Sequence, residues 1–280
     1  MTVTDHWRAI PVCLPVCLLV AAALCLVSCQ RGGTKSPERV PRTELSADER
    51  QSGFAFLTRD TQRLQTDAFE NPGYLWVETG RALFSEAPEQ GGESCASCHG
   101  ADGDGLVGAA TQYPLWHEGR GTLINLEGRI NQCRQEHQAL EPLAYESENL
   151  LSLTAFVTNL SLGLPMSVDP SPLAMDALAR GETYFHTRRG QLDLACSQCH
   201  TERWGMQLRG DTISQGHGNG FPTYRLAWQT LGSLHRRFRD CDLGVRAEPY
   251  PLGSDTYLAL ELYLATRAET LPVETPAIRR

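Results

Sequence analysis

The sequence predicts an all-α chain of two tandem domains that are related by internal duplication. Two pentapeptides carry this prediction, because CASCH at residues 95–99 and CSQCH at 196–200 both read C-x-x-C-H. In that motif two thiols bind haem covalently, and the histidine that follows ligates the iron. One copy could equally belong to a zinc site or a thiol redox site, whereas two copies in an exported chain favour haem. We therefore expect two cytochrome c-like domains with one covalently bound c-type haem each.

Segments around the two motifs recur in the same order, which is the second observation behind the duplication. GRALF (80–84) and GETYF (181–185) each begin 15 residues before the first cysteine of a motif, and each is expected to end an amphipathic helix. Farther along, LINLEGRINQC (123–133) and LGSLHRRFRDC (231–241) align without a gap. Chance similarity of short segments does not explain matches that keep both their order and their spacing.

Helices are expected to close both domains, at residues 147–165 and 254–272, where Leu, Phe, Val and Tyr recur at helical spacing. The first cytochrome c-like domain is expected over residues 60–166 and the second over residues 167–280. The hinge between them is expected at SVDPSP, residues 167–172.

The N-terminus is typical of an export signal over residues 1–29. Arg8 supplies a short charged region, and the apolar stretch at 11–27 is too short for a typical membrane span. The signal ends in LVSC, which resembles the lipobox of bacterial lipoproteins, so Cys29 is either lipidated or part of an ordinary cleaved signal peptide. Residues 30–59 are expected to form a linker and N-terminal extension. The mature protein is expected in the periplasm.

Composition narrows the ligands that the chain can recognise. A net charge of −8 argues against nucleic acid as the main partner. Lys35 is the only lysine, so arginine carries almost all the positive charge, and its planar fork of donors suits carboxylates, sulfur oxyanions or haem propionates. Six of the ten cysteines follow the signal, and three disulfides would be the default in an exported protein. The haem motifs instead claim four of these six: Cys95, Cys98, Cys196 and Cys199.

The two remaining cysteines, Cys133 and Cys241, hold equivalent positions in the duplication. We predict that each thiolate is the distal ligand of its haem iron, opposite His99 in the first domain and His200 in the second. A disulfide between Cys133 and Cys241 is an alternative in an oxidising compartment. Methionine and histidine are the usual distal ligands of small cytochromes c. The competing candidates are Met166 for the first haem, and Met206, His217 and His235 for the second.

The two haem motifs, the paired R-x-x-x-C motifs and the tail over residues 235–277 resemble the SoxA family, the dihaem subunits of SoxAX cytochromes in bacterial thiosulfate oxidation. The resemblance covers about residues 60–278 and is most specific over 219–275. It implies an L-cysteine S-thiosulfotransferase, which joins thiosulfate oxidatively to a cysteine of the sulfur carrier SoxYZ while two electrons leave through haem. It also implies a small SoxX-type cytochrome c subunit as a bound partner and a downstream cytochrome as electron acceptor.

By motif position, the resemblance makes Cys241 both distal ligand and reactive sulfur, often present as a persulfide, and makes Arg237 the residue that binds the sulfur oxyanion. The residue types agree, because a thiolate is a nucleophile and a guanidinium binds dianions. Arg129 holds the place of Arg237 in the first domain, so a structural role for Arg237, on a haem propionate or in a turn, stays open. Three other arginines near Cys241 have no counterpart near Cys133: Arg236, Arg239 and Arg246.

A second class of function also stays open. A dihaem electron-transfer protein would dock to a redox partner and perform no bond chemistry. Such a carrier needs no substrate pocket, and its irons usually bind methionine or histidine rather than thiolate.

Overall fold

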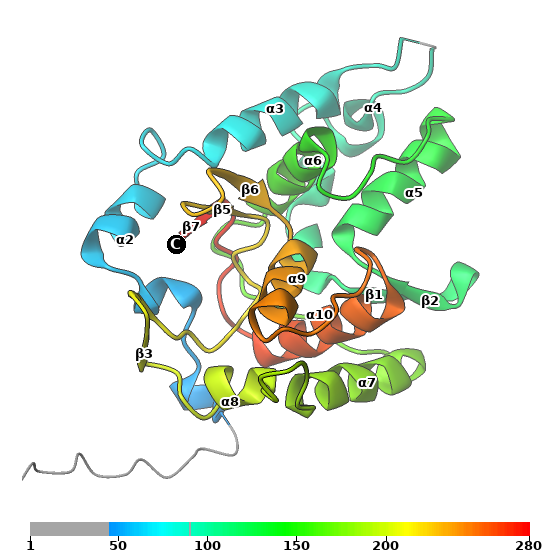
Figure 1. Ribbon diagram of the computed structural model, residues 1–280. Coiled ribbons are helices and arrows are strands. Elements are labelled where there is room, and N and C mark those ends of the chain that lie inside the picture. Colours follow the sequence, from blue (N-terminus) through cyan, green and yellow to red (C-terminus); the bar gives the residue numbers. More distant parts are fainter. Residues whose placement is uncertain (1–44, 90) are drawn as a thin grey trace, which may run out of the picture. The chain divides into compact units, whose positions relative to one another are not determined.

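The computed structural model of the protein describes residues 45–89 and 91–280, which are drawn in colour in Figure 1. All of the described residues belong to one compact unit. The predicted signal peptide, with Cys29, and residues 30–44 of the predicted linker lie outside the described residues. Within the described ranges, none of the helices combines the length and the apolar character that a membrane crossing requires.

We call residues 45–166 the first half and residues 167–280 the second half. The first half opens with two short 3-10 turns, Ala47–Glu49 and Gly53–Phe56. Its helices and strands follow in this order: α2 (Arg59–Thr66), α3 (Tyr74–Ser85), α4 (Cys95–His99), β1 (Leu115–His117), β2 (Thr122–Ile124), α5 (Leu126–Gln138) and α6 (Glu148–Asn159).

The second half repeats much of this order and adds strands. Its elements are α7 (Met175–His186), α8 (Cys196–His200), β3 (Gln207–Leu208), β4 (Asp211–Thr212), β5 (Thr223–Arg225), β6 (Thr230–Gly232), α9 (Leu234–Gly244), α10 (Asp255–Arg267) and β7 (Ala277–Arg279).

The prediction of an all-α chain needs correction, because the described residues include seven short strands. β1 pairs with β2, β3 with β4 and β5 with β6, all antiparallel, while β7 joins β5 in parallel. These strands are two or three residues long, which is too short for the alternating pattern by which sequence reveals a strand. Helices remain the main packing elements.

Four of the long helices begin at a polar N-cap. Asn125 caps α5, Ser147 caps α6, Ser233 caps α9 and Ser254 caps α10, each accepting a hydrogen bond from a backbone amide in the first turn. The predicted closing helices at 147–165 and 254–272 are confirmed in place, but they end earlier, at Asn159 and Arg267. The residues beyond them form turns.

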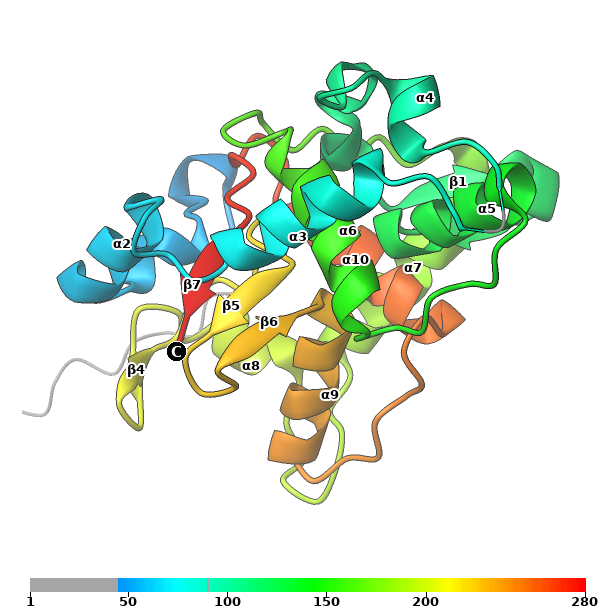
Figure 2. The same ribbon diagram turned by 90° about the horizontal axis from the view of Figure 1, so that it is seen from above.

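A glycine allows close crossing of the main helix pair in each half. Figures 1 and 2 show α7 beside α10 and α3 against α6. A Cβ on Gly80 of α3 would lie 2.0 Å from the carbonyl oxygen of Ser152, and a Cβ on Gly181 of α7 would lie 2.0 Å from that of Ala259. Any larger residue would therefore force the helices apart.

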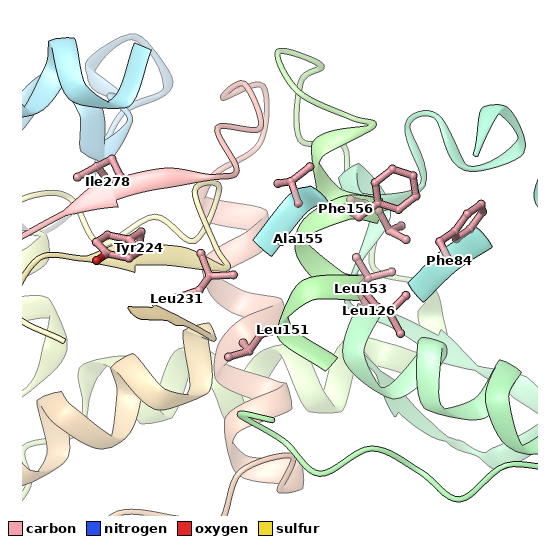
Figure 3. Packing of buried hydrophobic residues seen from close by; sticks show 12 residues of the cluster. Phe84, Leu126, Leu151, Leu153, Ala155, Phe156, Tyr224, Leu231 and Ile278 are labelled. Atoms are coloured by element: carbon pink, nitrogen blue, oxygen red, sulfur yellow. The ribbon is translucent and has the colours of Figure 1, made fainter. Parts of the chain in front are cut away.

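Each half inserts apolar side chains of its hairpin into the core of the other half. The core around α3 and α6 also contains Tyr224 and Leu231 from β5 and β6, and Ile278 from β7 (Figure 3). The core around α7 and α10 contains Leu123 from β2. Leu123 and Leu231 are the first residues of the two aligned stretches, so each half inserts the same residue into the core of the other. The halves are thereby interlocked.

A short antiparallel pairing also joins the halves, at matching places in the two closing turns. Pro165 and Pro272 form the bridge. The amide of Met166 donates to the carbonyl of Leu271 at 2.8 Å, and the amide of Thr270 donates to the carbonyl of Met166 at 2.9 Å. Because Leu164-Pro165 pairs with its own counterpart Leu271-Pro272, the local arrangement is close to twofold.

Candidate functional site

The first C-x-x-C-H motif forms the short helix α4 at the edge of an apolar core. Its N-cap, Ser94, accepts a hydrogen bond from the amide of Ser97 at 3.1 Å. Cys95 packs against the core cluster that contains Phe84, and the rings of Phe84 and His99 lie 6.5 Å apart. The motif thus offers two thiols and an imidazole next to apolar side chains.

The second motif forms α8, and its histidine is held more firmly. Nδ1 of His200 donates to the carbonyl oxygen of Ser214 at 2.8 Å, which leaves Nε2 as the nitrogen that can bind a metal. Burial lowers the pKa of His200 to about 4. The ring is therefore neutral at physiological pH, which is the form that ligates iron.

A glycine-bearing loop forms the wall behind His200. Gly216 has a φ of +76°, and a Cβ at this position would lie 2.8 Å from Cγ of His200, so only glycine fits. Gln215 fixes the loop to the N-terminal segment, because its Oε1 accepts from the amide of Gln51 at 2.7 Å and its Nε2 donates to the carbonyl of Glu49 at 2.8 Å. The residues before α2 therefore support the second site.

The structure brings each additional cysteine to the haem motif of its own half. Burial and the neighbouring Cys241 and Asp242 raise the pKa of the Cys196 thiol to about 12. In the first half, burial and the neighbouring Cys133 raise the pKa of the Cys95 thiol. All six described cysteines are free, so Cys133 and Cys241 do not form the alternative disulfide.

A buried carboxylate lies directly after Cys241. Asp242 accepts hydrogen bonds from the hydroxyls of Tyr184, at 2.8 and 2.9 Å, and of Tyr257, at 2.7 Å. Arg189 lies 3.8 Å from the same carboxylate, and its guanidinium stacks 4.2 Å above the ring of Tyr184. These contacts anchor the C-terminal part of α9, which carries Cys241, to α7 and α10.

Two guanidinium groups near Cys241 form no ion pair within the part of the chain that the structure describes. Arg237 precedes Cys241 by one helical turn, and among residues 45–89 and 91–280 its side chain has no hydrogen bond or ion pair. Burial, together with the charge of Arg237, lowers the pKa of Arg225 to about 10. Nε of Arg225 is buried without a partner among the described residues, although Asp240 and Asp211 lie near enough to oppose the shift in its pKa. Neither Arg225 nor Arg237 forms an ion pair within those residues.

The corresponding arginine of the first half is engaged in a different way. Nη1 of Arg129 donates to Oε1 of Gln132 at 2.8 Å, and Gln132 in turn contacts His117 and Glu136 at 2.9 and 2.8 Å. Glu136 also helps to raise the pKa of Cys133, after the larger effect of burial. The surroundings of Cys133 therefore include an acidic group and a bonded arginine, together with Arg134, whose buried Nε has no partner among the described residues.

The other arginines on this helix have less direct roles. Arg236 pairs with Glu146 at 3.6 Å and stacks 4.3 Å above the ring of Trp228, so it is structural. Arg239 is half-buried, and Arg246 is exposed after the end of α9.

Three of the competing ligand candidates are engaged or turned elsewhere. Met206 is 45% exposed, and Met166 is buried in the core cluster of α7 and α10. Nδ1 of His235 accepts a hydrogen bond from the amide of Gly253 at 3.0 Å, and its Nε2 lies 2.9 Å from Oε2 of Glu261, so neither nitrogen is available to iron. The fourth candidate, His217, is buried, and its Nε2 donates to Oε1 of Gln215 at 3.1 Å, while its Nδ1 has no partner among the described residues.

Sequence reasoning did not identify Arg225, Asp242 and the tyrosines that bind it. Asp242 follows Cys241 directly, but an aspartate on a helix is ordinarily a solvated residue, and its tyrosine partners lie far away in the sequence. Arg225 belongs to a three-residue strand that was not predicted. A feature that could have drawn notice is its position between two aromatic residues, in YRLAW.

The residues present fit covalently bound haem. Cys196 packs against a cluster of buried aromatic side chains that includes Phe185 and Phe238, as an apolar macrocycle requires. His200 is neutral, oriented by a carbonyl and open at Nε2.

Comparison with known proteins agrees with this arrangement. The family model described as SoxA/TsdA, cytochrome c domain, matches residues 79–166. The L-cysteine S-thiosulfotransferase subunit SoxA of Rhodovulum sulfidophilum is 39% identical over 83% of this chain and 81% of the relative. The subunit of the same name from Pseudaminobacter salicylatoxidans is also 39% identical, over 83% of this chain and 82% of its own.

A solved structure supports the same relationship in three dimensions. The crystal structure of SoxXA from P. pantotrophus matches with a TM-score of 0.78 and 35% identity, covering 82% of this chain and 86% of that chain. The predicted resemblance is thereby confirmed, and so is a cytochrome c domain with covalent haem. The chain belongs to the SoxA family of L-cysteine S-thiosulfotransferase subunits.

Proposed function

We propose that this chain is the SoxA subunit of an L-cysteine S-thiosulfotransferase and that it joins thiosulfate oxidatively to a cysteine of a SoxYZ-type sulfur carrier. The activity by which its relatives are named supports the reaction. One observation carries the assignment of the site. The guanidinium of Arg237 lies one helical turn before Cys241 and has no carboxylate partner among the described residues.

The cofactors in this proposal are two c-type haems. Cys95 and Cys98 would attach the first, and Cys196 and Cys199 the second. The axial pairs would be His99 with Cys133 and His200 with Cys241. The proximity of each extra cysteine to its own motif supports these pairs.

When bound, the haem of the second half would accept electrons and keep the Cys241 sulfur ionised. Arg237 and Arg225 would hold the sulfonate oxygens of thiosulfate, since guanidinium groups that lack a carboxylate partner can bind a dianion. The sulfane sulfur would then face Cys241. Asp242, fixed by two tyrosine hydroxyls, would keep the turn that carries Cys241 in place.

The bond chemistry balances as two steps. The thiolate of Cys241 and the thiosulfate dianion form an S–S bond and release two electrons, which yields a cysteine S-thiosulfonate. The thiolate of the carrier then attacks the sulfane sulfur, and Cys241 leaves as thiolate, as in thiol–disulfide exchange. The carrier thiol loses one proton, and Cys241 is regenerated.

The two halves would be cytochrome c-like domains related by duplication, over residues 60–166 and 167–280. The hairpin β5–β6 begins 108 residues after β1–β2 (223 minus 115), and α9 begins 108 residues after α5 (234 minus 126). The close helix crossings at Gly80 and Gly181 and the near-twofold pairing of the closing turns also support a duplication.

The proposed partners are a SoxX-type cytochrome c subunit, the SoxYZ-type carrier and a downstream electron-acceptor cytochrome. The matched SoxXA structure supports the first. An open groove of about 730 Å³, lined by Arg189, Arg246 and Tyr250 just after α9, supports an approach of the carrier from that side. The proposed location is the periplasm, with or without a lipid anchor on Cys29.

A pair of matched variants tests the role of Arg237. Arg237→Leu should weaken thiosulfate use by about 2–5 kcal/mol of transition-state stabilisation, because it removes a charge that pairs with substrate away from water. Arg129→Leu removes the equivalent guanidinium of the first half. Steady-state transfer to the carrier and haem content would be measured for both. Equal loss of activity with equal loss of haem would show that both arginines are structural.

Replacing the sulfur ligand Cys241 distinguishes the proposed transferase from an electron-transfer protein without bond chemistry. Cys241→Met should keep a six-coordinate haem but abolish transfer to the carrier. Electron paramagnetic resonance of the native protein should show low-spin thiolate ligation. Methionine or bis-histidine signals at both irons would favour the carrier without bond chemistry.

A further inference from the structure

A small cavity lies between the two halves, and no residue of either haem motif lines it. Its volume is about 60 Å³. The first half contributes Tyr113, Glu127 and Thr154 to its lining, and the second half contributes Asn219, Phe221 and Glu261. A cavity of this size has room for several water molecules, since one water needs about 10–15 Å³.

Two carboxyl groups face this cavity, and no basic residue lines it. Glu127, near the N-terminus of α5, is only 8% exposed. Oε2 of Glu261 is already used, because it accepts from Nδ2 of Asn125 at 3.1 Å and lies 2.9 Å from Nε2 of His235. A second ionised carboxylate beside it, without a cation, would be strongly disfavoured.

An unpartnered acceptor lines the same cavity. Asn219 is 3% exposed, its Nδ2 donates to the carbonyl of Pro272 at 2.8 Å, and its Oδ1 has no partner within residues 45–89 and 91–280. A buried amide oxygen normally finds a donor. A carboxylic acid proton, directly or through water, supplies such a donor, as the hydroxyls of Tyr113 and Thr158 in the same lining also can.

We propose that this cavity is an internal proton-binding site, in which Glu127 takes up one hydrogen ion from solvent and holds it together with bound water. Nothing in this assignment depends on the proposed transferase activity. A metal ion is a poorer occupant, because residues 45–89 and 91–280 contain no group of three or more His, Cys, Asp and Glu side chains arranged to hold one.

The charged groups around Glu127 come from three directions, and the carboxylates among them favour protonation. Burial and the charge of Glu261 on α10 raise the pKa of Glu127 to about 7. Glu146, before α6, acts in the same direction, but it is paired with Arg236 at 3.6 Å. His235 on α9 opposes the shift when charged.

The hydrogen bonds of His235 direct its ring toward Glu261 and not toward Glu127. Burial lowers the pKa of His235, while the carboxylates of Glu261 and Glu127 raise it by more. Nδ1 accepts the amide hydrogen of Gly253, so a ring proton resides on Nε2, which lies 2.9 Å from Oε2 of Glu261. The ring of Tyr145 stacks on His235 at 5.9 Å and 2°, which limits its reorientation. A charged His235 would therefore pair with Glu261, and Glu127 has no ion-pair partner among the described residues.

The sign of the pH effect follows from this shift. The folded protein binds a proton at Glu127 that the unfolded chain releases, because the pKa of a glutamate in an unfolded chain has its ordinary value of 4.5. Stability is therefore full below that value and falls as pH rises through about 7. Since α5 and α10 belong to different halves, deprotonation weakens the junction between them.

Infrared spectroscopy of the holoprotein tests the site directly. The C=O stretch of a protonated carboxylic acid should be present at slightly acidic pH and disappear as pH rises through about 7. The band should be lost in Glu127→Gln and kept in Glu182→Gln, which removes an exposed carboxylate of α7. The wild type and both variants carry the same haem propionates. Subtracting the spectrum of each variant from that of the wild type therefore leaves only the band of the replaced glutamate. A band that persists unchanged in Glu127→Gln would overturn the proposal.

A second variant keeps the test informative if Glu127→Gln fails to fold. Glu261→Gln removes the neighbouring charge, so the midpoint at which the band disappears should shift to lower pH. An unshifted midpoint, or a wild-type protein with no such band at any pH, would also overturn the proposal.

Discussion

Gly181→Ala probes the helix crossing that holds the second half together. The added Cβ would lie 2.0 Å from the carbonyl oxygen of Ala259, 2.6 Å from its carbon and 2.9 Å from Cβ of Tyr263. Carbon and oxygen atoms in close contact lie about 3.3 Å apart, so α7 and α10 would have to separate by about 1 Å. Overpacking of this kind costs about 1–3 kcal/mol, and this case belongs at or above the upper end, because backbone atoms cannot rotate away.

Alanine favours the helix by about 1 kcal/mol over glycine, so the net loss should be at least about 2 kcal/mol. For a chain of this size that corresponds to a fall in Tm of about 4–8 °C, measured by circular dichroism of the holoprotein. Gly244→Ala is the matched control, because Gly244 ends α9 and no atom lies within 4 Å of its added Cβ. If Gly181→Ala melts at or above the wild-type temperature, as Gly244→Ala should, the close crossing does not exist.

Leu231→Ala should lower the free energy of unfolding by about 3–5 kcal/mol in a denaturant titration, because this fully buried side chain fills the core of the opposite half; a loss below about 1 kcal/mol would contradict hairpin exchange. Tyr257→Phe removes one hydroxyl donor to buried Asp242 and should cost about 1.5–3 kcal/mol, and an unchanged Tm would argue against that bond. Ser233→Ala removes the N-cap of α9 and should cost about 1 kcal/mol, whereas no change would mean that the cap is dispensable. Wild-type protein should lose stability by up to about 1.4 kcal/mol per unit as pH rises from 4.5 to about 7, and Glu127→Gln should lose less; identical slopes would exclude Glu127 as the cause.

Much of the local organisation could be predicted from the sequence because its causes are local. The haem motifs, the helix-capping residues and the apolar periodicity of α6 and α10 act within a few residues of one another. The spacing of repeated segments also predicted that Cys133 and Cys241 would each lie near a motif, and the structure brings each to its own half.

The remaining features depend on contacts between distant residues. No local pattern indicates that Leu123 and Leu231 pack into opposite halves, since both sit in ordinary apolar positions. Glu127 reads as a favourable acidic residue in the first turn of a helix, and its burial arises only when α10 covers it. Strands of three residues form because neighbouring segments supply their hydrogen-bond partners. The side chains of such a strand are too few to show the alternating pattern that would predict it.

The last strand sets an order of assembly. Ile278 of β7 lies in the core built by α3 and α6, and its amide donates to Oε1 of Gln65 at 3.1 Å. In the proposed export the chain would emerge from its N-terminus onward, so this core would stay incomplete until residue 278 had crossed. During that interval the thiols of Cys95 and Cys98, the proposed attachment sites of the first haem, would be accessible. Covalent attachment would therefore come before β7 completes the core of the first half.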